Sequence, residues 1–315
     1  MSMLTLVTEM GVIFVLVMIG YYACKRGVLT PEPQKACSWI VVNVCNPCMM
    51  LNAAISLEYR MPVSTLLRAL LVSGFMFLTL IAAAYIVPPV IRIPPNERYT
   101  FKMLSVFGNI GFIGLPVCSA VLGDESLIYV TVGCLLYNLI FYTQGIYILD
   151  KARRIFGEGD GDNGKKGFDL RDLLNMGTIG SVAAVFIYLL DPQLPMLVND
   201  VVRYLAEATV FLSMAVLGAS LAMSGFKSLF GNRRMYLFLF IRMLVLPIFI
   251  ITVLKQFISD PLVLGSIAIM SSLPGGNLPL MRAKETGLEG SELSQGILLS
   301  TAVCIFTIPV VCLFL

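Results

Sequence analysis

Two glycine- and proline-rich stretches interrupt long apolar segments at matching places in the two halves of the chain. The first reads Gly-Asn-Ile-Gly-Phe-Ile-Gly-Leu-Pro at 108–116, and the second reads Ser-Ser-Leu-Pro-Gly-Gly-Asn-Leu-Pro at 271–279. Glycine and proline weaken or break a helix. Non-helical backbone at membrane depth persists only where it is buried in protein or lines a cavity. A matched pair of such breaks is typical of the substrate site of a membrane transporter.

The composition indicates that most of the chain is solvated by lipid. It is 58% hydrophobic and 13% charged, with a mean hydropathy of +0.88, whereas a soluble domain carries about 25% charged residues. About 20 apolar residues are enough to cross the hydrocarbon core of a bilayer. Ten segments of this kind are predicted, at 4–23, 36–57, 69–91, 103–123, 126–149, 173–190, 201–226, 235–254, 261–281 and 293–315.

The basic residues are distributed unequally between the two sides that ten alternating spans define. Of the 22 Lys and Arg residues, 17 fall on one side and 4 on the other, while Arg242 lies within a span. The positive-inside rule assigns the richer side to the cytoplasm and both termini to the outside. We therefore expect a multi-pass protein of the cell inner (plasma) membrane. The net charge of +3 suggests no nucleic-acid partner.

One long polar segment divides the predicted spans into two sets of five. We expect a first repeat at 1–150, a cytoplasmic linker at 151–171 and a second repeat at 172–315. Because five is an odd number, a second half with the fold of the first would be inserted upside down, as an inverted repeat. The predicted fold class is therefore an all-α polytopic membrane protein with ten transmembrane helices in two inverted five-helix repeats.

The sequence gives little support to metal, redox or enzymatic chemistry. It has eight cysteines and no histidine, and the cysteines lie mostly within predicted spans, where a free thiol behaves as a small apolar side chain. No paired acidic motif lies within the spans. We expect no catalytic residue, no metal site and no cofactor, and we interpret the chain as something other than an enzyme.

Several motifs in combination resemble the auxin efflux carrier family. They are the Gly-Asn-x-Gly-x-x-Gly-x-Pro element at 108–116, Lys-Arg-Gly-Val-Leu at 25–29 followed by Asn46-Pro47, Arg-Met-Leu-Val-Leu-Pro at 242–247, Leu-Pro-Gly-Gly-Asn-Leu-Pro at 273–279, and Leu-Ser-Thr-Ala at 299–302 with Ile308-Pro309. The resemblance covers nearly the whole chain. It implies that broken helices four and nine cross at mid-membrane and that small organic anions are transported, such as auxins in plants and malonate or malate in bacteria. The short central loop resembles that of a bacterial member.

The two breaks supply groups that could recognise a carboxylate. A new helix start presents free N–H groups and about half a positive charge. Pro116, and Pro274 or Pro279, suit the first position of such a helix. Asn109 and Asn277 provide amides, and the resemblance implies that Asn109 contacts substrate. The alternative is that both asparagines satisfy their own breaks. The predicted substrate-binding residues are Asn46, Asn109, Gly111, Gly114, Pro116, Arg242, Pro274, Gly275, Gly276 and Asn277.

Charged and kinked positions within the spans allow more than one interpretation. Arg242 could attract the anion, mainly from the cytoplasmic side, pair with Glu207, or extend to the cytoplasmic interface. Glu207 and Glu9 are the only carboxylates expected within the membrane, so they are the candidates for coupling to protons. Asn46 and Pro47 kink the second span, either beside the site or only for packing.

These observations favour a secondary carrier for small organic anions such as mono- or dicarboxylates, working by alternating access. The expected partners are the anion and the lipid bilayer, and a homodimer is left open as an assembly. One alternative is a sodium- or proton-coupled symporter or antiporter of related architecture, although an antiporter for cations would need aspartates in the breaks. Another is a membrane receptor that binds a small molecule without moving it.

Overall fold

The described part of the protein, in a computed structural model, is entirely helical. It comprises residues 3–55, 63–156, 176–190, 192–223, 233–285, 288 and 291–315. Within these ranges the only β-type pairing is one isolated bridge. The α-helices are α1 (Met3–Lys25), α2 (Pro31–Ile40), α3 (Asn46–Ile55), α4 (Val63–Val90), α5 (Arg98–Val106), α6 (Leu115–Leu122), α7 (Leu127–Ile140), α8 (Ile146–Phe156), α9 (Met176–Leu190), α10 (Met196–Met223), α11 (Arg233–Phe240), α12 (Leu246–Leu254), α13 (Pro261–Ser271), α14 (Asn277–Glu285) and α15 (Ser291–Cys312).

Several of these helices are joined end to end into membrane-length segments. By length and composition, six continuous helices among the described residues can cross a bilayer: Pro31–Ile55, Ser64–Val90, Asp124–Ile155, Met196–Met223, Arg233–Leu254 and Glu292–Cys312. Four shorter apolar helices accompany them: Gly11–Lys25, Ile110–Leu122, Met176–Leu190 and Pro261–Ser271. The chain is thus a polytopic helical membrane protein.

Three of the continuous helices contain a wide, π-helical turn just before a proline. These turns are η1 (Val41–Cys45), η2 (Ile110–Gly114) and η7 (Ile241–Val245), and each precedes by two residues one of the prolines Pro47, Pro116 and Pro247. Proline has no N–H group, and its ring collides with the carbonyl group of the preceding turn. A widened turn removes that collision without ending the helix. The helices therefore continue through these prolines.

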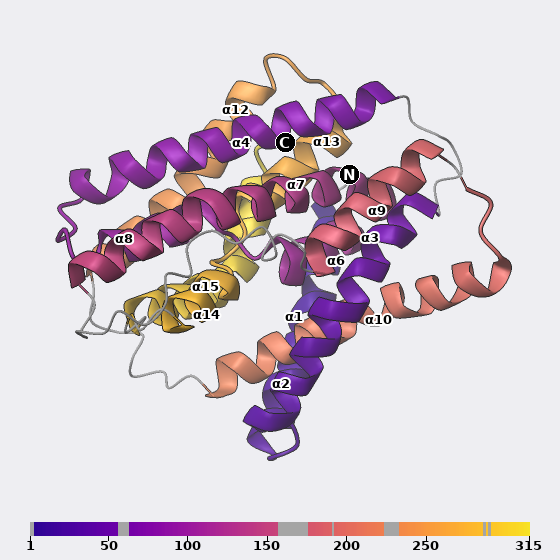
Figure 1. Cartoon of the computed structure of the whole chain (residues 1–315), viewed down its shortest axis with the longest axis horizontal. Coiled ribbons are helices and arrows are strands. Elements are labelled where there is room, and N and C mark those ends of the chain that lie inside the picture. Colours follow the sequence, from indigo (N-terminus) through magenta and orange to yellow (C-terminus); the bar gives the residue numbers. More distant parts are fainter. Residues whose placement is uncertain are drawn as a thin grey trace.

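The helices pack into two groups. In one, α1 lies along α10, and α3 packs against both α9 and α10. In the other, α4 contacts α5 and α7, α12 contacts α13, and α15 contacts α5 and α13. Figure 1 shows α4 running alongside α7. The groups meet where α7 packs on α3 and α9.

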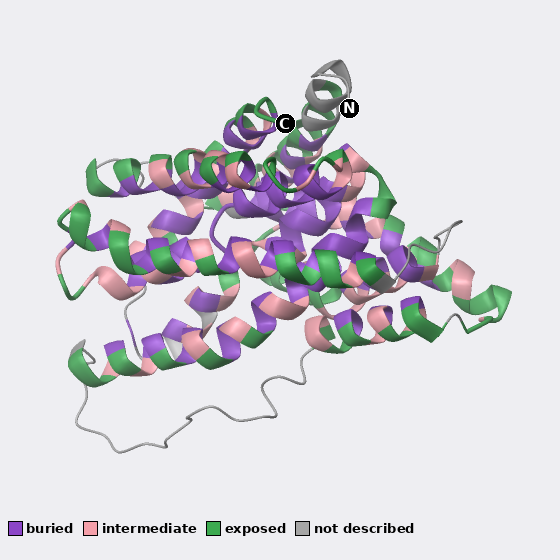
Figure 2. Cartoon of the chain, turned by 90° about the horizontal axis from the view of Figure 1, so that it is seen from above, coloured by how far each residue is buried: buried purple, intermediate pink, exposed green. Residues whose placement is uncertain are grey.

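Burial follows the pattern expected of a helical bundle whose outer surface contacts lipid. Figure 2 shows buried residues concentrated in the middle of the molecule and exposed residues on the outward faces of the peripheral helices. Many exposed side chains are large and apolar, such as Leu78 at 68% and Val90 at 71% exposed. Such a surface is costly in water and favourable in a bilayer, so it agrees with the membrane assignment.

The helix α8 overlaps the start of the predicted linker. α8 continues to Phe156, so helix covers the first residues of the predicted linker 151–171. Residues 157–175 lie outside the described part of the chain. The second half is described from Met176, where α9 begins.

Candidate functional site

The two breaks meet and form backbone hydrogen bonds with each other. Gly108, which follows α5, pairs in antiparallel fashion with Gly275, which follows α13. The Asn109 N–H donates to the Pro274 carbonyl oxygen at 2.8 Å, and the Gly276 N–H donates to the Phe107 carbonyl oxygen at 2.8 Å. Each break therefore satisfies polar backbone groups that the other leaves unpaired, as a membrane interior requires.

Little space is left for a side chain at Gly276, because the two backbones approach closely. A Cβ atom placed there would lie 3.2 Å from the Tyr137 hydroxyl oxygen and 3.3 Å from the carbonyl oxygens of Gly108 and Phe107. The adjacent Gly275 N–H donates to the Ser300 Oγ atom at 3.0 Å, which connects the crossing to α15. Backbone packing thus fixes the relative position of the two breaks.

The first break is followed by a helix that starts at Ile110, earlier than predicted. The Asn109 Oδ1 atom accepts a hydrogen bond from the Phe112 N–H at 3.3 Å and caps η2. Pro116 is consequently the second residue of α6, inside a helix that already runs from Ile110. The expectation that Pro116 begins this helix is wrong, because the asparagine cap and the wide turn η2 start the helix one turn and a half before it.

The second break is followed by α14, which starts at Asn277. Asn277 is exposed and Pro279 lies in the first helical turn, while Pro274 remains in the unwound stretch. The first N–H groups of a helix have no acceptor within that helix, and among the described residues no backbone bond outside the helix is found for the N–H groups of Gly111, Asn277 and Leu278. Two helix starts with unpaired N–H groups therefore flank the point where the breaks cross, and they carry partial positive charge.

Arg242 is buried at the same crossing. Its side chain lies on η7 and is 2% exposed. Its Nε atom donates to the Ser105 carbonyl oxygen at 2.6 Å, and its Nη1 atom donates to the Ser271 carbonyl oxygen. Its Nη2 atom is buried without a hydrogen-bond partner among the described residues. A Cβ atom on Gly108 would lie 3.6 Å from Nη2, so this nitrogen faces the first break.

The other interpretations of Arg242 are not supported by its position. It does not extend to the cytoplasmic interface, and it forms no ion pair with Glu207. Glu207 is exposed on α10, where its Oε1 atom lies 3.4 Å from the Nη1 atom of Arg203. The carbonyl ends of α5 and α13 provide better partners for the guanidinium, because they lack donors within their own helices. Glu9 lies on α1, and its side chain lies outside the described part.

Asn46 faces the first break from a neighbouring helix. It is the first residue of α3, directly after the wide turn η1, and is 5% exposed. Its Nδ2 atom would lie 3.5 Å from a Cβ atom on Gly111, and its Oδ1 atom is buried without a partner in the described chain. The kink before Pro47 therefore brings a polar amide to the crossing.

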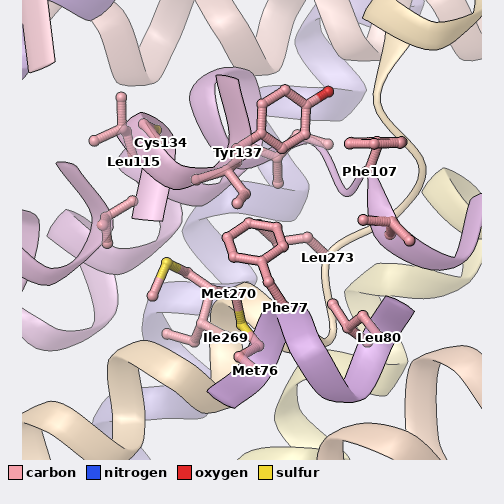
Figure 3. Packing of buried hydrophobic residues seen from close by; sticks show 14 of the residues in the cluster. Met76, Phe77, Leu80, Phe107, Leu115, Cys134, Tyr137, Ile269, Met270 and Leu273 are labelled. Carbon is pink, nitrogen blue, oxygen red and sulfur yellow. The ribbon is translucent and has the colours of Figure 1, made fainter. Parts of the chain in front are cut away.

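Tyr137 is a further polar group at the crossing, and it is not among the substrate-binding residues predicted from the sequence. Its ring packs edge-on against Phe107 at 5.5 Å between centroids and stacks with Phe141 at 6.3 Å. Figure 3 shows Tyr137 beside Phe107, with Leu273 of the second break close by. A Cβ atom on Gly114 would lie 2.8 Å from the Leu273 Cδ1 atom, so Gly114 also serves close packing here.

Sequence comparison identifies the family. A family model described as "Membrane transport protein" matches residues 5–157 and 165–312. The chain belongs to this family. The match confirms the resemblance to auxin efflux carriers, and the protein is a membrane transporter. It is also 23% identical over 308 residues to a protein of Methanocaldococcus jannaschii named "Uncharacterized transporter MJ1031", with 94% of each chain covered.

Proposed function

We propose that this transporter is a secondary carrier for small organic anions that binds its substrate at the crossing of the two breaks. The observation that carries the proposal is the convergence of two helix starts, which begin at Ile110 and Asn277, on the paired breaks at Gly108 and Gly275. Helix N-termini bind carboxylates through their N–H groups and their partial charge. The proposed contacts are the remaining predicted site residues at this point: Asn46, Asn109, Gly111, Gly114, Pro116, Pro274, Gly275, Gly276 and Asn277.

Ten membrane helices in two inverted repeats fit this function. The six long apolar helices and the four shorter ones correspond one to one with the ten spans predicted from the sequence. Under this assignment, the interrupted helices are the fourth of each half. Alternating access then follows if one group of helices moves against the other around the crossing.

A test of the substrate class starts with purified protein and a thermal-shift screen of mono- and dicarboxylates with two to six carbon atoms. Compounds that stabilise the protein are then offered to proteoliposomes as radiolabelled anions. Uptake above that of protein-free liposomes is the expected result. Stabilisation without uptake would indicate a receptor instead, and the absence of stabilisation by every carboxylate would contradict the anion assignment.

The orientation in the inner membrane is predicted from the unequal distribution of basic residues. One contact agrees with the alternation: Arg68 lies 3.8 Å from Asp260, both on the predicted outer side. On the predicted cytoplasmic side, burial lowers the pKa of Lys102, and the neighbouring charges of Lys151 and Arg98 lower it further.

A phosphatase fused to the C-terminus should therefore be active in the periplasm, and a fluorescent protein fused there should stay dark. The opposite pattern would exclude ten spans with both termini outside.

The two asparagines at the helix starts are expected to contribute to anion binding. Asn109→Ala and Asn277→Ala should each weaken binding of the best carboxylate by about 10- to 150-fold, because a hydrogen bond to a charged group contributes about 1.5–3 kcal/mol. Titration calorimetry measures the effect. Asn43→Ala is the matched control, because its Nδ2 atom donates to the Trp39 carbonyl oxygen within its own helix. Wild-type affinity in both folded variants would show that these asparagines are structural.

A further inference from the structure

Arg242 connects the ends of both interrupted helices. Ser105 lies in the last turn of α5, and Ser271 is the last residue of α13. The last carbonyl groups of a helix have no donor within the helix, and both serine carbonyls are buried. The guanidinium group donates to one carbonyl from Nε and to the other from Nη1. One side chain thus caps two helices that are far apart in the sequence.

The electrostatic consequence follows from the helix dipoles. Each helix C-terminus carries about half a negative charge and each N-terminus about half a positive charge. At the crossing, the C-termini of α5 and α13 lie next to the starts of η2 and α14, so their contributions oppose one another. A buried guanidinium on the two C-termini offsets about one negative charge. The positive helix starts then dominate the potential that an anion would experience.

We propose that Arg242 is the positioning residue of the anion site and supplies its fixed counter-charge. It holds the C-terminal ends of α5 and α13 together, and it cancels their negative potential so that the opposite helix starts can bind a carboxylate. This inference rests on the proposed anion function. Because the crossing serves both orientations of the carrier, Arg242 affects binding from both sides of the membrane and not mainly from the cytoplasm.

The third nitrogen of the guanidinium supports this role. Nη2 is buried, has no partner among the described residues and faces Gly108. The unpaired part of the charge is therefore directed at the unwound turn between α5 and η2. A buried hydrogen-bond donor without a partner lowers the stability of the fold. The unpaired Nη2 group is explained if its positive potential in the first break is needed to bind the anion.

The first experiment distinguishes the effect of the Arg242 charge from the effect of its bonds to the ends of α5 and α13. It compares two ligands and three variants. The ligands are the carboxylate that most stabilises the wild type and the uncharged amide of the same acid. Arg242→Gln loses both the connection and the charge, so it should weaken amide binding 3- to 10-fold and carboxylate binding at least 10-fold more than amide binding. Arg242→Lys keeps the charge, so the preference for carboxylate over amide should persist while both ligands bind 3- to 10-fold more weakly.

The matched control for the loss of charge is Arg68→Gln. Arg68 also lies on a helix of the bundle, α4, but its side chain is 53% exposed and its ion-pair partner is Asp260. This variant should bind both ligands like the wild type. An equal loss for carboxylate and amide in Arg242→Gln would overturn the counter-charge role and leave a merely structural one. Loss of carboxylate binding on one side of the membrane alone would also contradict the proposal.

The second experiment needs no ligand, so it still decides the connecting role if the wild type binds no carboxylate and the proposed function fails. Hydrogen–deuterium exchange is measured on detergent-solubilised wild type, Arg242→Lys and Arg68→Gln. In Arg242→Lys, amides at 105–110 and at 271–277 should both exchange at least 10-fold faster, because a lysine cannot hold both carbonyl ends. Unchanged exchange in either stretch would overturn the connecting role. Arg68→Gln should leave both stretches unchanged.

Discussion

Valine at Gly20 is expected to prevent the carrier from reaching its folded state, whereas valine at Gly11 of the same helix is expected to be tolerated. α1 and α10 cross so closely that a Cβ atom on Gly20 would lie 2.0 Å from the Ala215 carbonyl oxygen. In the same crossing, a Cβ atom on Gly218 would lie 1.9 Å from the Val17 carbonyl oxygen. Small residues that allow two membrane helices to touch in this way are typical of tight helix pairs.

The expected cost of Gly20→Val is about 3 kcal/mol or more, at or above the usual range for an overpacked core, because backbone atoms cannot rotate away from the new side chain. Yield and monodispersity in size-exclusion chromatography, with the thermal midpoint of any folded fraction, measure the effect. Gly11 is the control because no atom lies within 4 Å of a Cβ atom placed there. Equal stability of the two valine variants would show that α1 and α10 do not pack as described.

Valine at Gly276 is expected to abolish transport in a protein that still inserts and folds. The substitution would push against the carbonyl oxygens of Gly108 and Phe107. It would therefore separate the two breaks and remove the hydrogen bond from the Gly276 N–H to Phe107. The helix starts at Ile110 and Asn277 would no longer converge, so the proposed anion site would be lost.

Flux of the identified carboxylate into proteoliposomes measures this effect, and the expected rate equals that of protein-free liposomes. Gly74→Val is the matched control, because Gly74 lies within α4 and no atom is found within 4 Å of a Cβ atom placed there. That variant should transport like the wild type. Transport at wild-type rate by a folded Gly276→Val protein would show that the crossing is not the substrate site.

Much of the local structure was predictable because it depends on neighbouring residues. Long apolar segments identified the membrane helices, and glycine with proline identified both breaks, since helix length and backbone freedom are local properties. The wide turns before Pro47, Pro116 and Pro247 were not foreseen. A proline indicates that a helix is disturbed, but whether the helix ends or widens depends on neighbours that can hold it together, and for this reason the start at Pro116 was misplaced.

The positions of the polar side chains were decided by contacts between distant segments. Asn46 was one candidate among several, and only the packing of α3 brings its amide to Gly111. Tyr137 was not among the predicted site residues, yet its hydroxyl lies beside Gly276. Glu207 was a candidate for coupling, yet it lies exposed next to Arg203. Nothing in the local sequence distinguishes these outcomes.

The sequence by itself determined that this protein is a helical membrane protein with two interrupted helices. The length of an apolar segment, and the glycine and proline residues that interrupt a helix, can both be read from short stretches of sequence. The tertiary structure alone decided that the interruptions pair at Gly108 and Gly275 and that Arg242 caps the helices on both sides of that pairing. The partners of Arg242 are backbone carbonyl groups, which every residue possesses. The three-dimensional arrangement leaves two of these carbonyl groups without donors in an interior that cannot solvate them. It therefore determines the position of the buried guanidinium.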